Sequence, residues 1–337
     1  MGQSVGEHVN NTYHSNGDIG LRIYPIWLPS VNPCVESSGP QAQYMYTLTS
    51  FRNGGNGIFG KSHGSIHHID YNLIENGGDA ISIVKLENVV YDNDPHFVRP
   101  LIVATLEPNF NAYQNVGKFA IFAPQREFFY VQNATIVNFG STGALTGCNE
   151  CLVGAEMNQG GLTTRYEGLK FVNTTRRIYW SDTKKEILWD LDGSLAGVPD
   201  SMITRSYGHL KFDDECTVLT PESTFSDSIR CGSATSSVRI RRMQLESVTP
   251  SQLSYTDLVV RSSAGEGEFY FLPLDTYGWV FPVVTGGNRS YSLHWRDAGI
   301  SAYTLRFRLG RDPYLLEFIN SIPRIDETVR MDYQPHM

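Results

Sequence analysis

The chain has 337 residues, of which 41% are hydrophobic, 12% are aromatic and only 18% are charged, and its formal net charge is −8. The acidic balance, with no dominant basic run, argues against a nucleic-acid-binding protein. No stretch of eighteen apolar residues is present, so the sequence contains no candidate membrane span. Low charge combined with many aromatic residues, 31 glycines and 16 prolines favours an all-β protein.

A repeated pattern starts close to the N-terminus, with SNGDIGLRI from Ser15. Its clearest copies are FRNGGNGI from Phe51 and IENGGDAI from Ile74, which are offset by 23 residues and align Asn53 with Asn76. Weaker copies begin at Val137 and Val172. A short period of this kind indicates stacked repeats. Gly and Asn adopt left-handed turns cheaply, and stacked Asn amides can bond to one another, so the pattern predicts coils of a parallel β-helix. Because the repeat pattern is already present at Ser15, we expect this chain to be a segment of a larger protein.

The same stretch matches a phosphate-binding loop, Gly55-x-x-x-x-Gly60-Lys61-Ser62. That motif needs a helix directly after the loop, so that backbone N–H groups point at the phosphates. The following residues, HGSIHHIDYNLIENGG, contain almost no strong helix former. We therefore predict no nucleotide binding and place Lys61 on an exposed turn of a solenoid.

The length and spacing of the predicted strands change along the chain. Residues 1–212 contain short β runs separated by Gly, Asn and Asp, and residues 213–233 are polar, as expected for a linker loop. After that segment, longer alternating runs recur every 12 to 16 residues, which is typical of an antiparallel sandwich. The sequence thus predicts a parallel β-helix over 1–212 and a β-sandwich-like domain over 213–337.

Cysteines and sequons indicate an extracellular protein. Glycosylation sequons occur at Asn10, Asn133, Asn173 and Asn288. Cys216 and Cys231 flank a short polar loop and are predicted to form a disulfide. Cys148 and Cys151 form a C-x-x-C pair without the context of a redox motif or a zinc site, so a local disulfide is expected there too. That leaves Cys34 as the odd cysteine, whose partner could lie beyond this segment.

The most specific stretch is IYWSDTKKEILWDLDGSLAGVPDSMI, from Ile178 to Ile203. Its core, WDLDGSLAG, resembles the DxDGSxxG segment of the fibrocystin family, which includes fibrocystin-L and, more distantly, the hyaluronan-binding proteins that induce cell migration. NGGNGIFGKSHGSIHH and YGWVFPVVTGGNRSYSLHW also resemble segments of that family. The resemblance implies a right-handed parallel β-helix within a large extracellular protein. It carries no catalytic residue over to this chain.

Asp190, Asp192 and Ser194 in this core allow two interpretations. Two carboxylates two residues apart, followed by Gly, could begin a calcium loop, but the Glu that would complete an EF-hand loop is replaced by Ser201. Otherwise the Asp and Ser side chains bond to their own backbone in a tight turn. Without a complete ligand set, no metal or other cofactor is assigned.

A search for catalytic groups gives His67, His68, Asp70, Asp79, Asp190 and Asp192, with Lys61 as a possible neighbour. Alternation along a strand would place His68 and Asp70 on one face. A solvated polar face is the plainer explanation, so no catalytic residue is assigned. We expect an extracellular structural or adhesive glycoprotein segment whose partners are protein chains or glycans. The alternative is a polysaccharide-binding or polysaccharide-degrading β-helix related to the hyaluronan-binding proteins.

Overall fold

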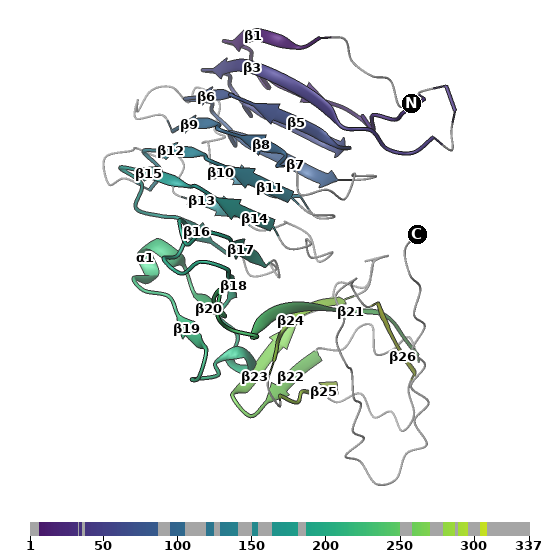
Figure 1. Ribbon diagram of the computed structural model, residues 1–337, viewed down its shortest axis with the longest axis vertical. Helices are drawn as coiled ribbons and strands as arrows, with labels where there is room; N and C mark the ends of the chain where they lie inside the picture. The colour runs from purple at the N-terminus through teal and green to yellow at the C-terminus, as the bar shows by residue number, and fades with distance from the viewer. Residues whose placement is uncertain are drawn as a thin grey trace.

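The residues that the structure describes form an all-β protein, as predicted. The computed structural model describes residues 7–32, 34–35, 38–86, 95–104, 119–124, 129–140, 150–153, 164–180, 187–249, 258–269, 279–286, 289–295 and 304–308. These residues contain strands β1 to β26, one short α-helix and one short 3-10 helix (Figure 1). Within these ranges, no helix is long and apolar enough to cross a membrane.

The elements follow one another in short steps. In chain order they are β1 (Val9–His14), β2 (Leu21–Ile23), β3 (Gln43–Phe51), β4 (Ile58–His63), β5 (Ile66–Ile69), β6 (Asn72–Ile74), β7 (Ile81–Leu86), β8 (Phe97–Val98), β9 (Leu101–Val103), β10 (Phe119–Phe122), β11 (Phe129–Gln132), β12 (Thr135–Val137), β13 (Glu150–Val153), β14 (Thr164–Glu167), β15 (Lys170–Val172), β16 (Ile178–Tyr179), β17 (Leu188–Asp190), β18 (Ser201–Arg205), the 3-10 helix (Gly208–Leu210), β19 (Cys216–Val218), α1 (Glu222–Phe225), β20 (Ser228–Cys231), β21 (Arg239–Thr249), β22 (Leu258–Ser262), β23 (Gly265–Phe269), β24 (Trp279–Thr285), β25 (Ser292–Trp295) and β26 (Thr304–Arg308).

Strands β1 to β17 are arranged in three parallel ladders. The first ladder is β1–β3–β6–β9–β12–β15. The second is β3–β5–β8–β11–β14–β17, and the third is β2–β4–β7–β10–β13–β16. The chain visits the ladders in a fixed order, so that β6, β7 and β8 supply one strand to each before β9, β10 and β11 do the same. We call each such cycle of three strands a coil, and the stacked coils fill the upper part of Figure 1.

Buried side chains repeat in register from coil to coil. β-Branched residues suit this packing because they fit well on a pleated surface that is covered on one side. Fully burying one such side chain stabilises the fold by about 1.5–3 kcal/mol. The register-matched, fully buried residues include Leu73, Ile102 and Ile136 in the first ladder and Ile58, Ile81 and Ile121 in the third.

The predicted alignment of Asn53 with Asn76 is confirmed. Both side chains are buried, and Asn53 Nδ2 donates to Asn76 Oδ1 over 2.9 Å. Asn16 continues the series, because its Nδ2 donates to Asn53 Oδ1 over 2.9 Å. The residue before each of these asparagines has a positive φ: Ser15 (56°), Arg52 (50°) and Glu75 (51°). These three asparagines therefore form a side-chain ladder at one corner of adjacent coils, which we call the Asn corner.

The nucleotide-loop match lies partly in a strand. Gly60, Lys61 and Ser62 belong to β4, and the next element is strand β5 rather than a helix. The prediction that Lys61 occupies a turn is therefore wrong, although its side chain is exposed as expected. The Lys61 ammonium lies 5.0 Å from the centroid of the Tyr24 ring.

The pairing changes from parallel to antiparallel at β17. Strand β18 pairs antiparallel with β17, and β20 and β19 extend the same sheet. The segment 213–233, predicted as a linker loop, thus contains two paired strands and α1. Beyond it lie two three-stranded antiparallel sheets, β24–β21–β26 and β23–β22–β25, in the lower part of Figure 1. The division into two domains stays a prediction.

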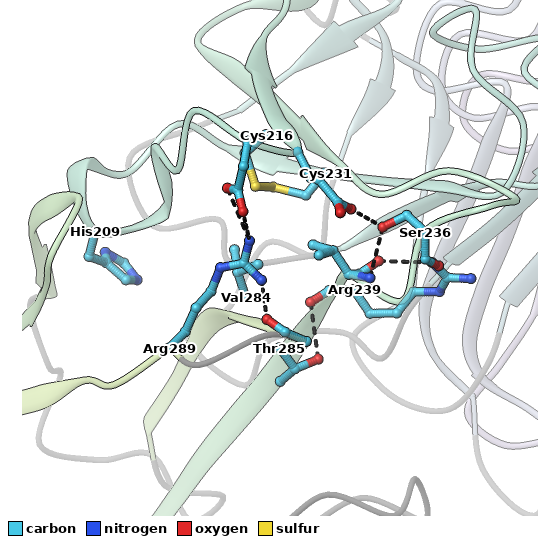
Figure 2. The surroundings of a disulfide bond; sticks show 12 residues. His209, Cys216, Cys231, Ser236, Arg239, Val284, Thr285 and Arg289 are labelled. Carbon is cyan, nitrogen blue, oxygen red and sulfur yellow. Dashed lines mark hydrogen bonds and ion pairs between the residues drawn. A yellow bond between two sulfur atoms is a disulfide. The ribbon is translucent and has the colours of Figure 1, made fainter.

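The predicted Cys216–Cys231 disulfide is present, and it joins β19 to β20. Figure 2 shows Arg289 reaching toward this hairpin, where its guanidinium bonds to both carboxylate oxygens of Asp214 over 3.0 and 3.1 Å. Thr285 Oγ1 donates to the carbonyl of Arg239 over 3.2 Å, which links β24 to β21. The disulfide hairpin is thus connected to the antiparallel sheets that follow it.

Candidate functional site at the end of the parallel ladders

The turn after β17 contains the most distinctive stretch of the sequence. Along the interior of the second ladder, Phe97 is in register with Val131, Val131 with Tyr166, and Tyr166 with Asp190. All four side chains are fully buried. Asp190 therefore occupies the core position of the last parallel strand, where the preceding coils carry large hydrophobic side chains.

The Asp190 carboxylate is bonded to the turn that follows it. Its oxygens accept from the backbone N–H groups of Leu195, over 3.2 Å, and Ala196, over 2.8 Å. Burial raises the pKa of Asp190, while these two hydrogen bonds favour its ionised form. Leu195 is fully buried and belongs to the same hydrophobic core as the coils. Asp190 thus folds the turn back so that Leu195 covers the last coil.

Two arginines hold the outer side of this turn. Arg177 Nη1 donates to the carbonyl of Leu195, and Arg230 Nη1 donates to the carbonyl of Ala196, each over 3.0 Å. Gly193 and Gly197 both have a φ of +85°, a conformation that glycine adopts at little cost. The two glycines were visible in the sequence, but the arginines were not, because they come from β20 and from the residue before β16.

Asp192 replaces a backbone acceptor. In earlier coils, the N–H of Arg99 donates to the carbonyl of Gln132, and the N–H of Asn133 donates to the carbonyl of Glu167. The next N–H in this series, that of Gly168, donates instead to Asp192 Oδ2 over 2.8 Å. The Asp192 side chain therefore satisfies a donor that a further coil would otherwise pair.

Ser194 satisfies the next backbone N–H group of the preceding coil. Its Oγ accepts from the N–H of Leu169 over 2.9 Å and donates to Asp192 Oδ1 over 2.6 Å. Partial burial alone would raise the pKa of Asp192, but the hydrogen bonds from Ser194 and Gly168 outweigh it and lower the pKa. Both Asp192 oxygens and the Ser194 oxygen are thus occupied by donors of the protein.

This geometry supports the turn interpretation over the calcium interpretation. A calcium loop would direct several oxygens at one point, whereas these oxygens point at backbone N–H groups. Across the part of the chain that the structure describes, no group of three or more His, Cys, Asp or Glu side chains is placed to hold a metal ion.

The chain resembles known proteins along most of its length. It is 33% identical to mouse (Mus musculus) fibrocystin over 143 residues, which cover 41% of this chain and 3% of that protein. It is 26% identical to dog (Canis lupus familiaris) fibrocystin over 297 residues, which cover 86% of this chain and 7% of that protein. The chain is fibrocystin-like. No family model matches it. The fibrocystin-like chain thus spans only a small part of the length of these curated relatives.

The other candidate catalytic residues of the fibrocystin-like chain do not converge. His68 is fully buried in the second ladder, whereas Asp70 follows β5 with a φ of +57° and a side chain that is 48% exposed. The prediction that these two residues share one face of a strand is therefore wrong, because Asp70 lies in the corner and not in the strand. Asp70 forms a bidentate pair with Arg99 over 2.7 and 2.9 Å. Asp79 lies at the Asn corner, where its N–H bonds to Asn56.

Four buried histidines lie in or next to β5. The sequence alone identified only two of them, His67 and His68, as candidate catalytic residues. His63 Nε2 and His68 Nε2 are 3.0 Å apart, and His63 Nδ1 donates to the carbonyl of Gly64. His67 and His96 are stacked with ring centroids 5.6 Å apart, and His67 Nδ1 donates to the carbonyl of Pro95. Burial lowers the pKa of His63 to about 4 and the pKa of His68 and His96 well below the usual range. The rings of His63, His68 and His96 therefore pack as neutral aromatic groups at neutral pH.

The predicted modification sites are placed as follows. The side chains of Asn10, Asn133 and Asn173 are exposed, and each of the three residues has a positive φ. Asn173 Nδ2 also donates to Asn138 Oδ1 over 3.0 Å. Asn288, and the side chains that would form a Cys148–Cys151 bridge, lie outside the described residues. Cys34 is exposed and not bridged. Glycosylation at the four sequons stays a prediction.

Proposed function

We propose that this chain is a non-catalytic, structural segment of a large extracellular glycoprotein, built as a right-handed parallel β-helix closed at one end by antiparallel strands. The observation that carries the proposal is the use of the family-like Asp190–Ser194 turn as an end cap. Its polar atoms bond to the backbone of the preceding coil and leave no converging set of ligands or acid–base groups. A similarity that spans only 3% and 7% of the two fibrocystins supports a role as part of a larger molecule.

Exposed sequons and the disulfide support an extracellular location. Disulfides persist in oxidising compartments, and the Cys216–Cys231 bridge joins two paired strands. Sugars on Asn10, Asn133 and Asn173 would extend from exposed positions well separated along the chain and leave the apolar interior untouched. Such a surface suits contacts with other extracellular protein chains or glycans.

The test is the intact mass of the protein secreted from animal cells, measured before and after deglycosylation and with and without reduction. We expect a mass loss on deglycosylation that is reduced by Asn133→Gln and by Asn173→Gln. We also expect two thiols from Cys216–Cys231, and two more if Cys148 and Cys151 are bridged as predicted, that react with an alkylating reagent only after reduction. A product without glycan mass and with five reactive thiols would refute the extracellular assignment.

A second candidate, polysaccharide binding, is favoured by one observation. Tyr44 and Tyr46 are both about two-fifths exposed, and their rings stack at 6.5 Å on the outer face of β3. Exposed aromatic rings in a row can stack on sugar rings, by the same apolar contact that they make with each other. Titration with hyaluronan oligosaccharides tests this candidate. Saturable binding by the unsubstituted protein that is lost in Tyr44→Ala would support it. Absence of saturable binding to the unsubstituted protein, or equal binding by Tyr44→Ala, would exclude it.

A further inference from the structure

The three ladders end at β15, β16 and β17, and the ends are finished differently (Figure 1). In the second ladder, antiparallel β18 covers the edge of β17. In the third, the N–H of Arg177, directly before β16, donates to the carbonyl of Thr224 in α1. In the first, β15 pairs with β12 on one side and is the end strand of its sheet among the residues that the structure describes. We call the open side of residues 170–173 the β15 edge.

A backbone donor is left over at the β15 edge. In the preceding coils, the residue directly after each first-ladder strand donates its N–H to the last residue of the next strand: Glu75 to Val103, Ala104 to Val137 and Asn138 to Val172. Asn173 is the equivalent residue after β15, and none of the described residues accepts its N–H. Unpaired backbone groups on an exposed edge can pair with a strand of another molecule.

The side chains at the β15 edge are exposed as well. Val103, Val137 and Val172 are in register, but the first two are only partly exposed, whereas Val172 is 39% exposed. Proteins protect such edges with charged side chains or with a cover. Lys170 supplies a charge at the start of β15, but Phe171, Val172 and Asn173 supply none. The second half of the edge therefore needs another form of protection.

Asn173 lies at this second half and begins a glycosylation sequon, Asn-Thr-Thr. Its side chain is exposed, and its Nδ2 donates to Asn138 Oδ1 of the preceding coil over 3.0 Å. An N-linked sugar replaces one of the two Nδ2 hydrogens and leaves the other free to donate. The bonds of a planar amide nitrogen point apart, so a sugar on Asn173 extends away from Asn138. It therefore extends toward the open side of β15.

Asn133 is a matched sequon without this position. It is also exposed, and its φ of 56° is close to the 47° of Asn173. However, its N–H donates to the carbonyl of Glu167 in the next coil. Gly168 of that coil lies so close that an added Cβ would collide with Asn133 Oδ1. A sugar on Asn133 thus lies at a corner that is already followed by a further coil.

We propose that an N-linked glycan on Asn173 covers the β15 edge and keeps it from pairing with a strand of another molecule. The glycan comes from a lipid-linked oligosaccharide diphosphate. The bond from Nδ2 to the first sugar carbon forms, the bond from that carbon to the diphosphate oxygen breaks, and one Nδ2 proton is released with the diphosphate. This inference rests on the proposed function, because it assigns a role to one of the sugars of an extracellular glycoprotein.

The test compares proteins secreted from animal cells. Asn173→Gln and Thr175→Val each remove the sequon at Asn173, and the second leaves Asn173 itself unchanged. Asn133→Gln is the matched control, since it removes a sugar from a covered corner. A fourth protein, Asn173→Gln/Val172→Lys, carries a charge at the open edge. Glycopeptide mass spectrometry measures the occupancy of each sequon. Light scattering after size-exclusion chromatography and thioflavin T fluorescence, over a series of concentrations, measure β-sheet assembly.

We expect Asn173 to carry a glycan in the unsubstituted protein, and that protein to stay monomeric. Asn173→Gln and Thr175→Val should both lose their monomer as the concentration rises, in assemblies that bind thioflavin T. Asn133→Gln should stay monomeric. Adding Val172→Lys to Asn173→Gln should restore the monomer, because a charge on an edge strand opposes pairing.

Three results would overturn the proposal: an unoccupied Asn173, an Asn173→Gln protein as monomeric as Asn133→Gln, or assemblies that persist after Val172→Lys is added. Equal assembly of Asn133→Gln would show a general effect of sugars on solubility and would overturn it too. Assemblies of the glycosylated, unsubstituted protein that Val172→Lys dissolves would show that the edge takes a second copy instead. A protein with sugars on other sequons but none on Asn173 refutes this inference alone, whereas a protein without any glycan also refutes the proposed function.

Discussion

At the scale of single residues, polar side chains in this protein replace backbone partners. Asn53, Asn76, Asp192 and Ser194 each bond to groups of the neighbouring coil. A buried backbone or amide group that loses its partner costs about 1–3 kcal/mol. Their energetic role is therefore comparable with that of the apolar side chains beside them.

The variant Asn76→Leu tests this role. It removes the acceptor for the N–H and Nδ2–H groups of Asn53 and the donor to the carbonyl of Ser50. We expect the free energy of unfolding in urea to fall by roughly 1–3 kcal/mol. Lys61→Ala is the matched control. Its side chain is exposed, so stability should change by less than about 0.5 kcal/mol, and neither protein should bind ATP. An Asn76→Leu protein as stable as the control would contradict the Asn ladder.

At the scale of elements, the sequence predicted what depends on local chemistry. The Asn-Gly-Gly pattern identified equivalent corners at Asn53 and Asn76 because the coil between them has no insertion. The first coil was seen only as a weaker copy, because its Asn16 lies 37 residues before Asn53, with the loop after β2 inserted between them. The inward direction of His68 and Asp190 was not predicted. Alternation gives two faces for each strand, and only the register with Phe97 and Tyr166 shows which face is inside.

Three of the buried histidines, His63, His68 and His96, make the stability of the fold depend on pH. In the unfolded chain their pKa is about 6.5, whereas burial lowers the pKa of His63 to about 4 and that of His68 and His96 well below the usual range. The unfolded chain therefore binds protons between about pH 6.5 and 4 that the folded chain does not. Stability is fully present above pH 6.5 and is lost as the pH falls, with a slope of up to about 1.4 kcal/mol per pH unit for each histidine.

His96→Phe isolates one of these groups. Neither His96 ring nitrogen has a hydrogen-bond partner among the described residues, and the ring stacks between His67 and Phe129. Phe at this position therefore preserves the packing and removes the titration. In urea unfolding measured from pH 7 to 5, we expect the unfolding free energy of the variant to change less steeply with pH. The slope should be smaller by up to about 1.4 kcal/mol per pH unit, the value for one proton. Parallel curves for the two proteins would show that His96 is not buried as described.

At the scale of the whole molecule, the junction between the parallel coils and the antiparallel sheets is covalently reinforced. The Cys216–Cys231 bridge closes a loop with a sequence separation of 15 residues. The chain-entropy estimate for such a loop is about 3 kcal/mol. We expect Cys216→Ser/Cys231→Ser to lower the unfolding free energy by about 2–4 kcal/mol under non-reducing conditions. Adding a reductant should destabilise the unsubstituted protein by a similar amount and the double variant by less. A double variant as stable as the unsubstituted protein would contradict a structural role for the bridge.

The most direct test of the account is whether the Asp190–Ser194 turn closes the coils or binds a ligand. The measurement is hydrogen–deuterium exchange of the unsubstituted protein and of Asp192→Ala/Ser194→Ala, each with and without calcium. An end cap predicts faster exchange in the double variant at Gly168, Leu169 and the adjacent β14 and β15, with β3 to β5 unaffected and no effect of calcium on either protein. Slower exchange of the turn on adding calcium to the unsubstituted protein, or unchanged exchange at Gly168 and Leu169 in the variant, would contradict the account.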